Sequence, residues 1–527
     1  MSRSWLMVGA VLVAAGLSGC GGSDSTSAVT AASTAHGTLA VDPPLRVASV
    51  DAATLQAQLS SAAGGKQLLQ VTGAPACGVD FYYIRYWTTG GAGEVTESSG
   101  ALMVPTGAGN CSGSRPIVLY AHGTQTEKAF NIANIQDPGN SEGALVAAMF
   151  AAQGFIVVAP NYAGYDISTL GYHPFLNASQ QSGEMIDSLS AARSALPNTF
   201  GHAISDSGKL FLTGYSEGGY VALATLRAME GAGMPVTAAA PMSGPYALEA
   251  LFDAVMFGDV DLDSTVFSPL VTTSYQHAYG NLYSSTSDFY SSTYASGIDT
   301  LLPTTQPETA LFTNNLLPLT ALFDSTTPTA ADTGSALLAG ALAEPANPSD
   351  PRTALFDLGF GNPYLINNSV RIAYAADVLA DPDGVASGGA ALAAAVPIYP
   401  LRKDLYQNDL RAGSWAPTVP TLLCGGSNDP VVFFSVDTEV MAAFWSGLSP
   451  NPVTVLDVDP AGGPSGPFAA IQTGFQTSQA AELALLQTPD GGGLSLANAT
   501  QALVQNYHGT SVPPFCSLAA RGFFQSL

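Results

Sequence analysis

The chain has 527 residues, a length that fits one large domain with insertions or two domains. Hydrophobic residues make up 47% of it and charged residues only 10%, and it holds 55 glycines and 35 prolines. This composition excludes a coiled coil and a disordered chain and favours a loop-rich globular protein. The formal net charge of −25 repels nucleic acid and anionic lipid surfaces, so we expect neither as a partner.

The N-terminus is typical of an exported protein. Arg3 is followed by a short apolar run, Trp5–Leu17, which is too short for a transmembrane span. The run ends in Leu17-Ser18-Gly19-Cys20, which resembles the lipobox of bacterial lipoproteins. The resemblance implies a signal peptide over residues 1–20 and a lipid anchor on Cys20, the only expected attachment to a membrane, at the outer membrane or cell surface. The alternative is an ordinary signal peptide on a periplasmic or secreted protein.

Four further cysteines, an even number, remain after Cys20 is set aside: Cys77, Cys111, Cys424 and Cys516. In an exported protein they predict two disulfides, for which three pairings exist. We favour Cys77–Cys111, because a predicted hairpin between them brings its two ends together, and this choice leaves Cys424–Cys516. Free buried thiols are the alternative. No C-x-x-C pair occurs, so the cysteines do not suggest a zinc site.

Residues 21–45 are rich in Ser, Thr, Ala and Gly, which predicts a flexible tether before the first strands and helices. A hairpin is predicted first, with strands Phe81–Trp87 and Val95–Val104 around four small residues. Short apolar runs then alternate with helical patterns, the clearest of which are Ser182–Leu196 and Gly218–Met229. The runs are Pro116–Ala121, Phe155–Pro160, Lys209–Gly214, Val236–Met242, Thr421–Gly425 and Val453–Val458. This alternation predicts an α/β class with a doubly wound, mostly parallel sheet.

The alternation stops between Tyr246 and Trp415, where short helical pieces lie between Pro and Gly breaks. Because the stretch leaves the sheet and returns to it, we expect an inserted, largely helical cap over residues 246–414. The core then consists of residues 46–245 and 415–527. Ordinary long surface loops are the alternative, although loops of this length rarely lack packing of their own.

Gly214-Tyr215-Ser216-Glu217-Gly218 matches G-x-S-x-G between a predicted strand and a predicted helix. In that context the tight turn lifts a serine hydroxyl clear of the sheet, and the helix start places N–H groups beneath it. Side chains at the two glycine positions would clash with neighbouring elements. The motif predicts Ser216 as a nucleophile, and an ordinary strand–turn–helix connection is the alternative.

A serine hydroxyl needs a base, which in folds with this motif follows the nucleophile and the acid along the chain. Of six histidines, only His508 lies beyond both the serine and the expected cap. Asp429 directly follows a predicted buried strand, where the acid that orients the histidine is expected. Fallback acids are Asp437, Asp457 and Asp459. A surface histidine, and an aspartate that merely begins a turn, are the alternatives.

When a serine attacks an ester or amide carbonyl, the carbonyl oxygen becomes an oxyanion. N–H donors stabilise it, and each lowers the reaction barrier by roughly 3–4 kcal/mol. We expect one donor in the N–H of Glu217 and the other in the loop Ala121–Gln125, with Thr124 favoured over Gly123 or Gln125. The chemistry needs no metal and no organic cofactor. A simple strand-end turn is the alternative for this loop.

Tyr120–Thr124, Gly214–Gly219, Asn428-Asp429 and His508 together resemble the α/β-hydrolases of the esterase and lipase kind. Two further stretches, Ala159–Tyr165 and Ser190–Arg193, are similar to secretory lipases with a large lid. The resemblance implies a serine hydrolase that cleaves small-molecule or lipid carboxylic esters through an acyl-enzyme on Ser216. The sequence departs from the family pattern at Asn161, where related chains often carry Asp. It also departs in the stretch of some 50 residues that separates the last predicted strand from His508. A serine peptidase or amidase, and a non-catalytic surface-binding lipoprotein, are the alternatives.

Overall fold

The computed structural model describes residues 35–61, 63–137, 140–196, 204–343, 352–383, 397–446, 448 and 453–527. The predicted signal peptide, the lipobox with Cys20 and most of the predicted tether lie outside these residues. Within the described ranges, no helix combines the length and the apolar character that crossing a membrane requires.

A nine-stranded sheet forms the centre of the described chain, in the order β1-β2-β3-β5-β4-β6-β7-β10-β11. The first four strands of that order pair antiparallel, and every pair from β5 to β11 is parallel. The predicted doubly wound, mostly parallel sheet is therefore confirmed. The strands are β1 Leu45–Val50, β2 Gly78–Thr89, β3 Val95–Thr106, β4 Gly113–Ala121, β5 Ile156–Pro160, β6 Ile204–Tyr215, β7 Ala238–Met242, β10 Thr421–Gly425 and β11 Val453–Asp457.

Residues before the predicted hairpin already belong to the sheet and its helices. Gly37 and Ala40 donate backbone hydrogen bonds to Trp87 and Arg85 of β2, so the described end of the expected tether lies along the sheet. β1 and the helices α1 (Ala52–Ser61) and α2 (Ala63–Thr72) follow before β2. β1 is largely exposed as an edge strand, and such a strand lacks the clear apolar pattern by which buried strands are found.

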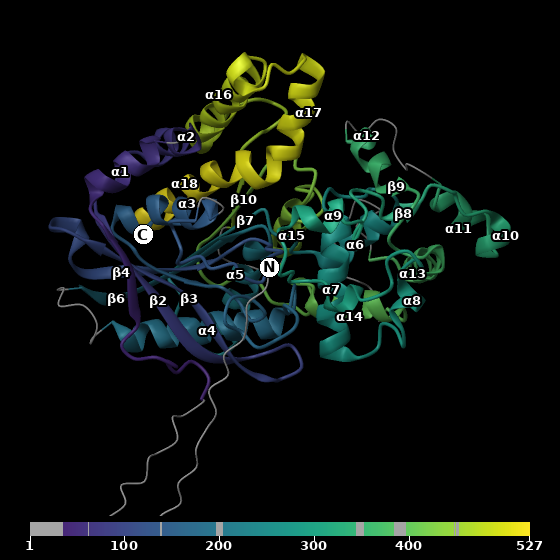
Figure 1. Cartoon of the computed structure of the whole chain (residues 1–527), viewed down its shortest axis with the longest axis horizontal. Coiled ribbons are helices and arrows are strands. Elements are labelled where there is room, and N and C mark those ends of the chain that lie inside the picture. The colour runs from purple at the N-terminus through teal and green to yellow at the C-terminus, as the bar shows by residue number, and fades with distance from the viewer. Residues whose placement is uncertain are drawn as a thin grey trace, which may run out of the picture. The chain divides into compact units, whose positions relative to one another are not determined.

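Alternating side chains of each central strand divide the core into two layers. In β4, Ile117 and Leu119 face one buried cluster with α4 (Ala178–Ala195) and α5 (Glu217–Gly231). Val118 and Tyr120 face the other cluster. Its helices are α1, α3 (Ser141–Met149), α16 (Ala469–Leu486) and α18 (Val512–Gln525), and Figure 1 shows them on the side of the sheet opposite α4. A sheet buried on both faces explains why its strands read as continuous apolar runs.

The chain between β7 and β10 is mainly helical, and Figure 1 shows it gathered beyond one end of the sheet. A pair of two-residue strands, β8 (Phe323–Asp324) and β9 (Phe360–Gly361), interrupts the helices. The helices are α6 Leu248–Phe257, α7 Ser264–Tyr279, α8 Thr286–Phe289, α9 Thr309–Thr313, α10 Ala330–Thr333, α11 Ala336–Ala341, α12 Thr353–Phe356, α13 Asn368–Ala380 and α14 Pro400–Asn408. After β10 come α15 (Thr438–Ser446) and, beyond β11, α16, α17 (Leu496–Asn506) and α18.

Both favoured disulfides are present, Cys77–Cys111 and Cys424–Cys516. The first closes the segment that holds the β2–β3 hairpin, as predicted. The second ties the end of β10 to α18, although the two cysteines are 92 residues apart in sequence. Disulfides of this kind persist in exported proteins.

We expect the Cys424→Ala/Cys516→Ala double variant to lose stability, by about 4–5 kcal/mol on the loop-entropy model. It should also lose activity near its melting transition, because the bond links the strand that precedes Asp429 to the helix that follows His508. The matched control, Cys77→Ala/Cys111→Ala, opens a loop far from both residues and should lose stability only. Thermal unfolding gives the Tm of each variant, and ester turnover is then measured at increasing temperature. If the two variants lose turnover at the same distance below their own Tm, the Cys424–Cys516 bond has no special role in holding the site.

Candidate active site

Ser216 lies in a tight turn between β6 and α5. Its φ is 59° and its ψ −125°, a conformation that non-glycine residues rarely adopt and that marks strain at functional turns. The flanking glycines permit the turn. A Cβ on Gly214 would lie 2.3 Å from the carbonyl oxygen of Gly218, and one on Gly218 would lie 2.0 Å from that of Ala121. The motif therefore contains glycine where β4 and α5 approach too closely for any side chain.

His508 reaches the serine from a π-helical turn, Tyr507–Ser511, between α17 and α18. Its Nε2 lies 2.7 Å from Ser216 Oγ. The hydroxyl of Tyr215, the residue before Ser216, donates a 2.6 Å hydrogen bond to the backbone oxygen of His508. The strand β6, which ends beside Ser216, therefore also fixes the backbone that carries the imidazole.

Asp429 completes a chain of hydrogen bonds. Its Oδ2 lies 2.7 Å from His508 Nδ1, and its Oδ1 accepts the backbone N–H groups of Val431 and Val432 at 2.9 and 3.2 Å. A carboxylate with both oxygens used as acceptors requires Nδ1 to carry the proton, which leaves Nε2 free to accept the serine proton. The three side chains thus have the arrangement needed to activate a hydroxyl.

The fallback acids are engaged elsewhere. Asp437 accepts the backbone N–H of Ala247, Asp457 accepts those of Ser427 and Asp459, and Asp459 accepts from Asn428 and Tyr507. Their hydrogen bonds support the loops on either side of Asp429 rather than His508.

The other described histidines also have local partners. The two ring nitrogens of His122 lie 2.6 and 3.1 Å from the backbone oxygens of Gly123 and Asn161, and burial lowers its pKa to about 4. His173 Nε2 lies 2.7 Å from Glu217 Oε1. His277 stacks on Tyr172, and the exposed His36 pairs with Asp187.

The expected oxyanion loop leaves the end of β4 beside the nucleophile. A Cβ placed on Gly123 would lie 3.7 Å from the Cβ of Ser216. The N–H of Gly123 donates to both carboxylate oxygens of Glu142, at 3.0 and 3.2 Å, so it is already used. Across the described chain, we find no acceptor for the N–H groups of Thr124 and Glu217. Of the loop candidates, Thr124 is therefore favoured over Gly123.

Glu142 is a residue that sequence reasoning missed. Its carboxyl, on α3, is buried between the N–H of Gly123 and the hydroxyl of Tyr120, which donates at 2.7 Å. Burial raises its pKa to about 7. A single Glu in a weakly patterned helix gives no signal in the sequence, since its role depends on the folded positions of β4 and α3.

The side chain of Glu217 was not predicted to take part either. It points away from its own N–H into the core, where Oε1 accepts from His173 and from Gln181 at 2.6 Å. Its other oxygen has no partner among the described groups. The residue after the nucleophile is thus fixed by a buried polar cluster beneath the turn.

Two buried carboxyls make the stability of the fold depend on pH. Burial raises the pKa of Glu142 to about 7 and that of Asp261 to about 8, and neither forms an ion pair within the described residues. The folded state binds these protons more tightly than the unfolded state does. The two carboxyls therefore contribute fully to the free energy of unfolding below about pH 4, and this contribution is lost as the pH rises through 7 and 8. We expect Tm to fall between pH 5 and pH 8.5.

The Glu142→Gln and Asp261→Asn variants should show a flatter dependence of Tm on pH, while Asp299→Asn, at an exposed site, should match the parent. Thermal unfolding in buffers of equal ionic strength checks this. A Tm that rises over this range in the parent would contradict the assignment of buried, protonated carboxyls.

Comparisons with known proteins place the fold. No family model and no curated protein matches the chain. The rice cell wall degrading esterase LipA from Xanthomonas oryzae is 26% identical, with a TM-score of 0.60 over 80% of this chain and 91% of LipA. A ligand-bound form of LipA is 23% identical, with a TM-score of 0.62 over 93% and 98%. A Legionella pneumophila protein is 19% identical, with a TM-score of 0.55 over 92% and 96%. The predicted resemblance to α/β-hydrolases of the esterase type is confirmed.

Proposed function

We propose that this chain, which has the α/β-hydrolase fold and resembles an esterase in structure, hydrolyses carboxylic esters. The observation that carries the proposal is the hydrogen-bond chain from Ser216 Oγ through His508 to Asp429, with 2.7 Å at each of its two links. Buried groups fix each member, and this preorganisation is what nucleophilic catalysis requires.

The mechanism follows from these positions. Ser216 attacks the ester carbonyl while His508 Nε2 takes its proton, and the N–H groups of Thr124 and Glu217 stabilise the oxyanion. The tetrahedral intermediate collapses as His508 returns the proton to the leaving alcohol, and the acyl group remains on Ser216. Water, deprotonated by the same imidazole, then releases the carboxylic acid. The steps need neither a metal nor a cofactor.

The proposal includes three parts of the sequence interpretation. Residues 46–245 and 415–527 form the catalytic core, and residues 246–414 form a cap over it. The signal peptide is cleaved before Cys20, which becomes the first residue of the mature protein and carries a lipid anchor. The two disulfides support this picture, because export places the chain in a compartment where they persist.

Labelling by a fluorophosphonate tests the proposed nucleophile, since the reagent requires an activated serine. The purified protein should incorporate one label, on the peptide that contains Ser216, and should turn over p-nitrophenyl esters much faster than peptide anilides. Failure of the folded protein to label would contradict a serine hydrolase. Faster cleavage of the anilides would instead favour a peptidase or amidase.

A further inference from the structure

Two cavities of very different size meet at Ser216. The large groove has a volume of about 1490 Å³ and lies between α1–α3 on one side and α16–α18 on the other. The small cavity has a volume of about 50 Å³ and lies against α6 and α7. Ser216, Thr124 and Phe267 line both, so the nucleophile is at their junction.

The proton path decides which part of an ester occupies which cavity. His508 lines the large groove and does not line the small cavity, whereas Glu217 lines only the small cavity. The leaving oxygen takes its proton from His508 Nε2, so the alcohol departs on the side of the large groove. The acyl group therefore stays on the side of the small cavity, next to the proposed oxyanion donors of Thr124 and Glu217.

The small cavity limits the length of the acyl group. A cavity of about 50 Å³ has room for only a few carbon-sized groups. Its walls are mainly apolar, with Leu251, Phe252 and Val255 from α6, Val431 and Val432 from the loop after Asp429, and Phe267 from α7. An acyl tail of about one to three carbon atoms beyond the carbonyl fills this volume.

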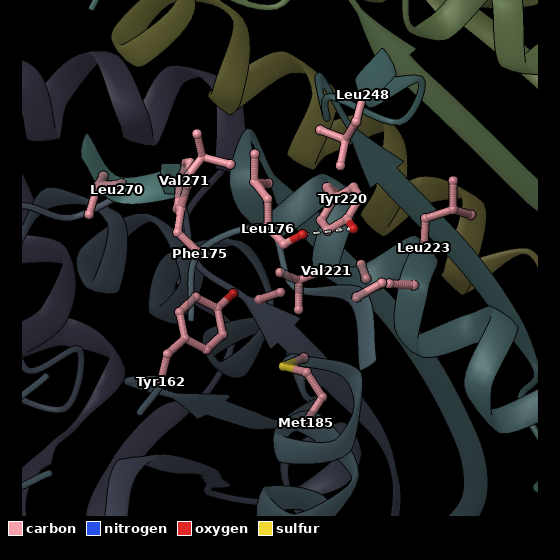
Figure 2. Close-up of a cluster of buried hydrophobic side chains, with 14 of the residues drawn as sticks. Tyr162, Phe175, Leu176, Met185, Tyr220, Val221, Leu223, Leu248, Leu270 and Val271 are labelled. Carbon is pink, nitrogen blue, oxygen red and sulfur yellow. Dashed lines mark hydrogen bonds between the residues drawn. The ribbon is translucent and has the colours of Figure 1, made fainter. Parts of the chain in front are cut away.

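The remaining wall of the small cavity is held in place by buried packing. Phe175 and Leu176 line it, and the hydroxyl of Tyr220 donates to the backbone oxygens of Leu176 and Asn408 at 3.1 and 2.7 Å. Figure 2 shows Tyr220 bonded to Leu176 among the surrounding buried side chains. A close-packed wall of this kind gives way to a longer chain only at a cost in free energy.

The large groove differs in its chemistry. Among the described residues that line it, no lysine or arginine occurs, whereas carboxyls do, including Asp137, Asp263 and Glu482. Hydroxyl and amide side chains are frequent along α2, α16 and the turn that bears His508, for example Gln67, Thr477 and Thr510. These groups suit an uncharged or cationic alcohol, and the carboxyls repel an anionic one.

We propose that the substrate is an ester of a short acyl group, of about two to four carbons, with a bulky alcohol that carries no negative charge. The inference deepens the proposed function and rests on it. Short acyl chains enter the small cavity, and the alcohol occupies the large groove beside His508.

A chain-length series of p-nitrophenyl esters tests the acyl part. We expect kcat/KM to be highest between acetyl and butyryl and to fall at least tenfold by octanoyl. A maximum at octanoyl or beyond, in protein that a fluorophosphonate labels stoichiometrically, would overturn the inference and leave the proposed function intact. Absence of both labelling and hydrolysis would mean that the proposed function itself fails.

A pair of variants on α6 shows whether the small cavity sets the limit. Phe252→Ala enlarges the cavity and should move the maximum toward hexanoyl or octanoyl esters. Phe257→Ala, the matched control, removes the same half-buried side chain from the same helix outside both cavities and should leave the preference unchanged. An unchanged preference in folded Phe252→Ala protein would overturn the assignment of the acyl group to this cavity.

The alcohol part is tested with two acetates of similar leaving-group reactivity. Phenyl acetate should be hydrolysed at least tenfold faster, by kcat/KM at low salt, than 4-acetoxybenzoate, whose leaving alcohol carries a carboxylate. Added salt should narrow the difference, because it screens the carboxyls of the groove. Equal rates at low salt, or faster hydrolysis of the anionic ester, would overturn the proposed charge selection.

Discussion

The Ser216→Ala variant should lose on the order of 10⁴-fold or more in kcat, because triad members elsewhere contribute effects of this size. In the proposed mechanism the hydroxyl oxygen forms the acyl-enzyme, and alanine offers no atom that can attack the carbonyl. Binding of substrate in the two cavities should persist, so KM should change little compared with kcat. Steady-state hydrolysis of p-nitrophenyl acetate measures both constants.

The matched control for this variant is Ser188→Ala, in α4. Ser188 is buried, whereas Ser216 is half-buried, and among the described residues the hydroxyl of Ser188 bonds to the backbone of its own helix, at Met185. Its loss should leave kcat/KM within about twofold of the parent, as expected for a site away from the reacting atoms. Near-normal hydrolysis by Ser216→Ala would contradict the assignment of the nucleophile.

The Asp429→Asn variant should lose about 10⁴-fold in kcat with little change in fold, as the equivalent change does in other triads. An asparagine keeps an acceptor for the N–H groups of Val431 and Val432. It also offers an N–H₂ group, which forces His508 to carry its proton on Nε2, so that the imidazole no longer accepts the serine proton. The ratio of kcat values near neutral pH measures the effect.

Asp437→Asn is the control for that variant, because Asp437 is equally buried and was a fallback acid in the sequence. Burial raises the pKa of Asp437 well above its usual range, because the site disfavours a charged carboxylate, so an uncharged amide is a mild replacement there. We expect kcat within about threefold of the parent. A loss in Asp437→Asn as large as that in Asp429→Asn would show that the acid had been assigned to the wrong residue.

The sequence was sufficient to predict the parts of the fold that repeat a simple pattern. Strands buried on both faces, such as β4 and β6, are continuous apolar runs, and Gly214 and Gly218 mark a turn that no other residue allows. β1, α1 and α2 were missed because they lie at an exposed edge, where the pattern of buried positions is weak.

The residues of the candidate site likewise fall into those that the sequence indicates and those that only the folded structure reveals. Motif, strand ends and chain order restricted the candidates to Ser216, Asp429 and His508, and the structure places these three side chains in contact. Glu142 and the cluster of Glu217, His173 and Gln181 were not predictable, since they act through contacts between segments far apart in sequence. The gap of some 50 residues before His508, which made its placement less certain than that of Ser216, contains α16 and α17.

The most direct test of the account is to identify the covalent intermediate. The protein is mixed rapidly with p-nitrophenyl acetate, quenched in acid during the first turnover and digested for mass spectrometry. The acetyl group should lie on Ser216, at a level equal to the p-nitrophenol released in the burst, and should be absent from Ser216→Ala. Acetyl found on another residue at that level, or a full burst from Ser216→Ala, would contradict the mechanism.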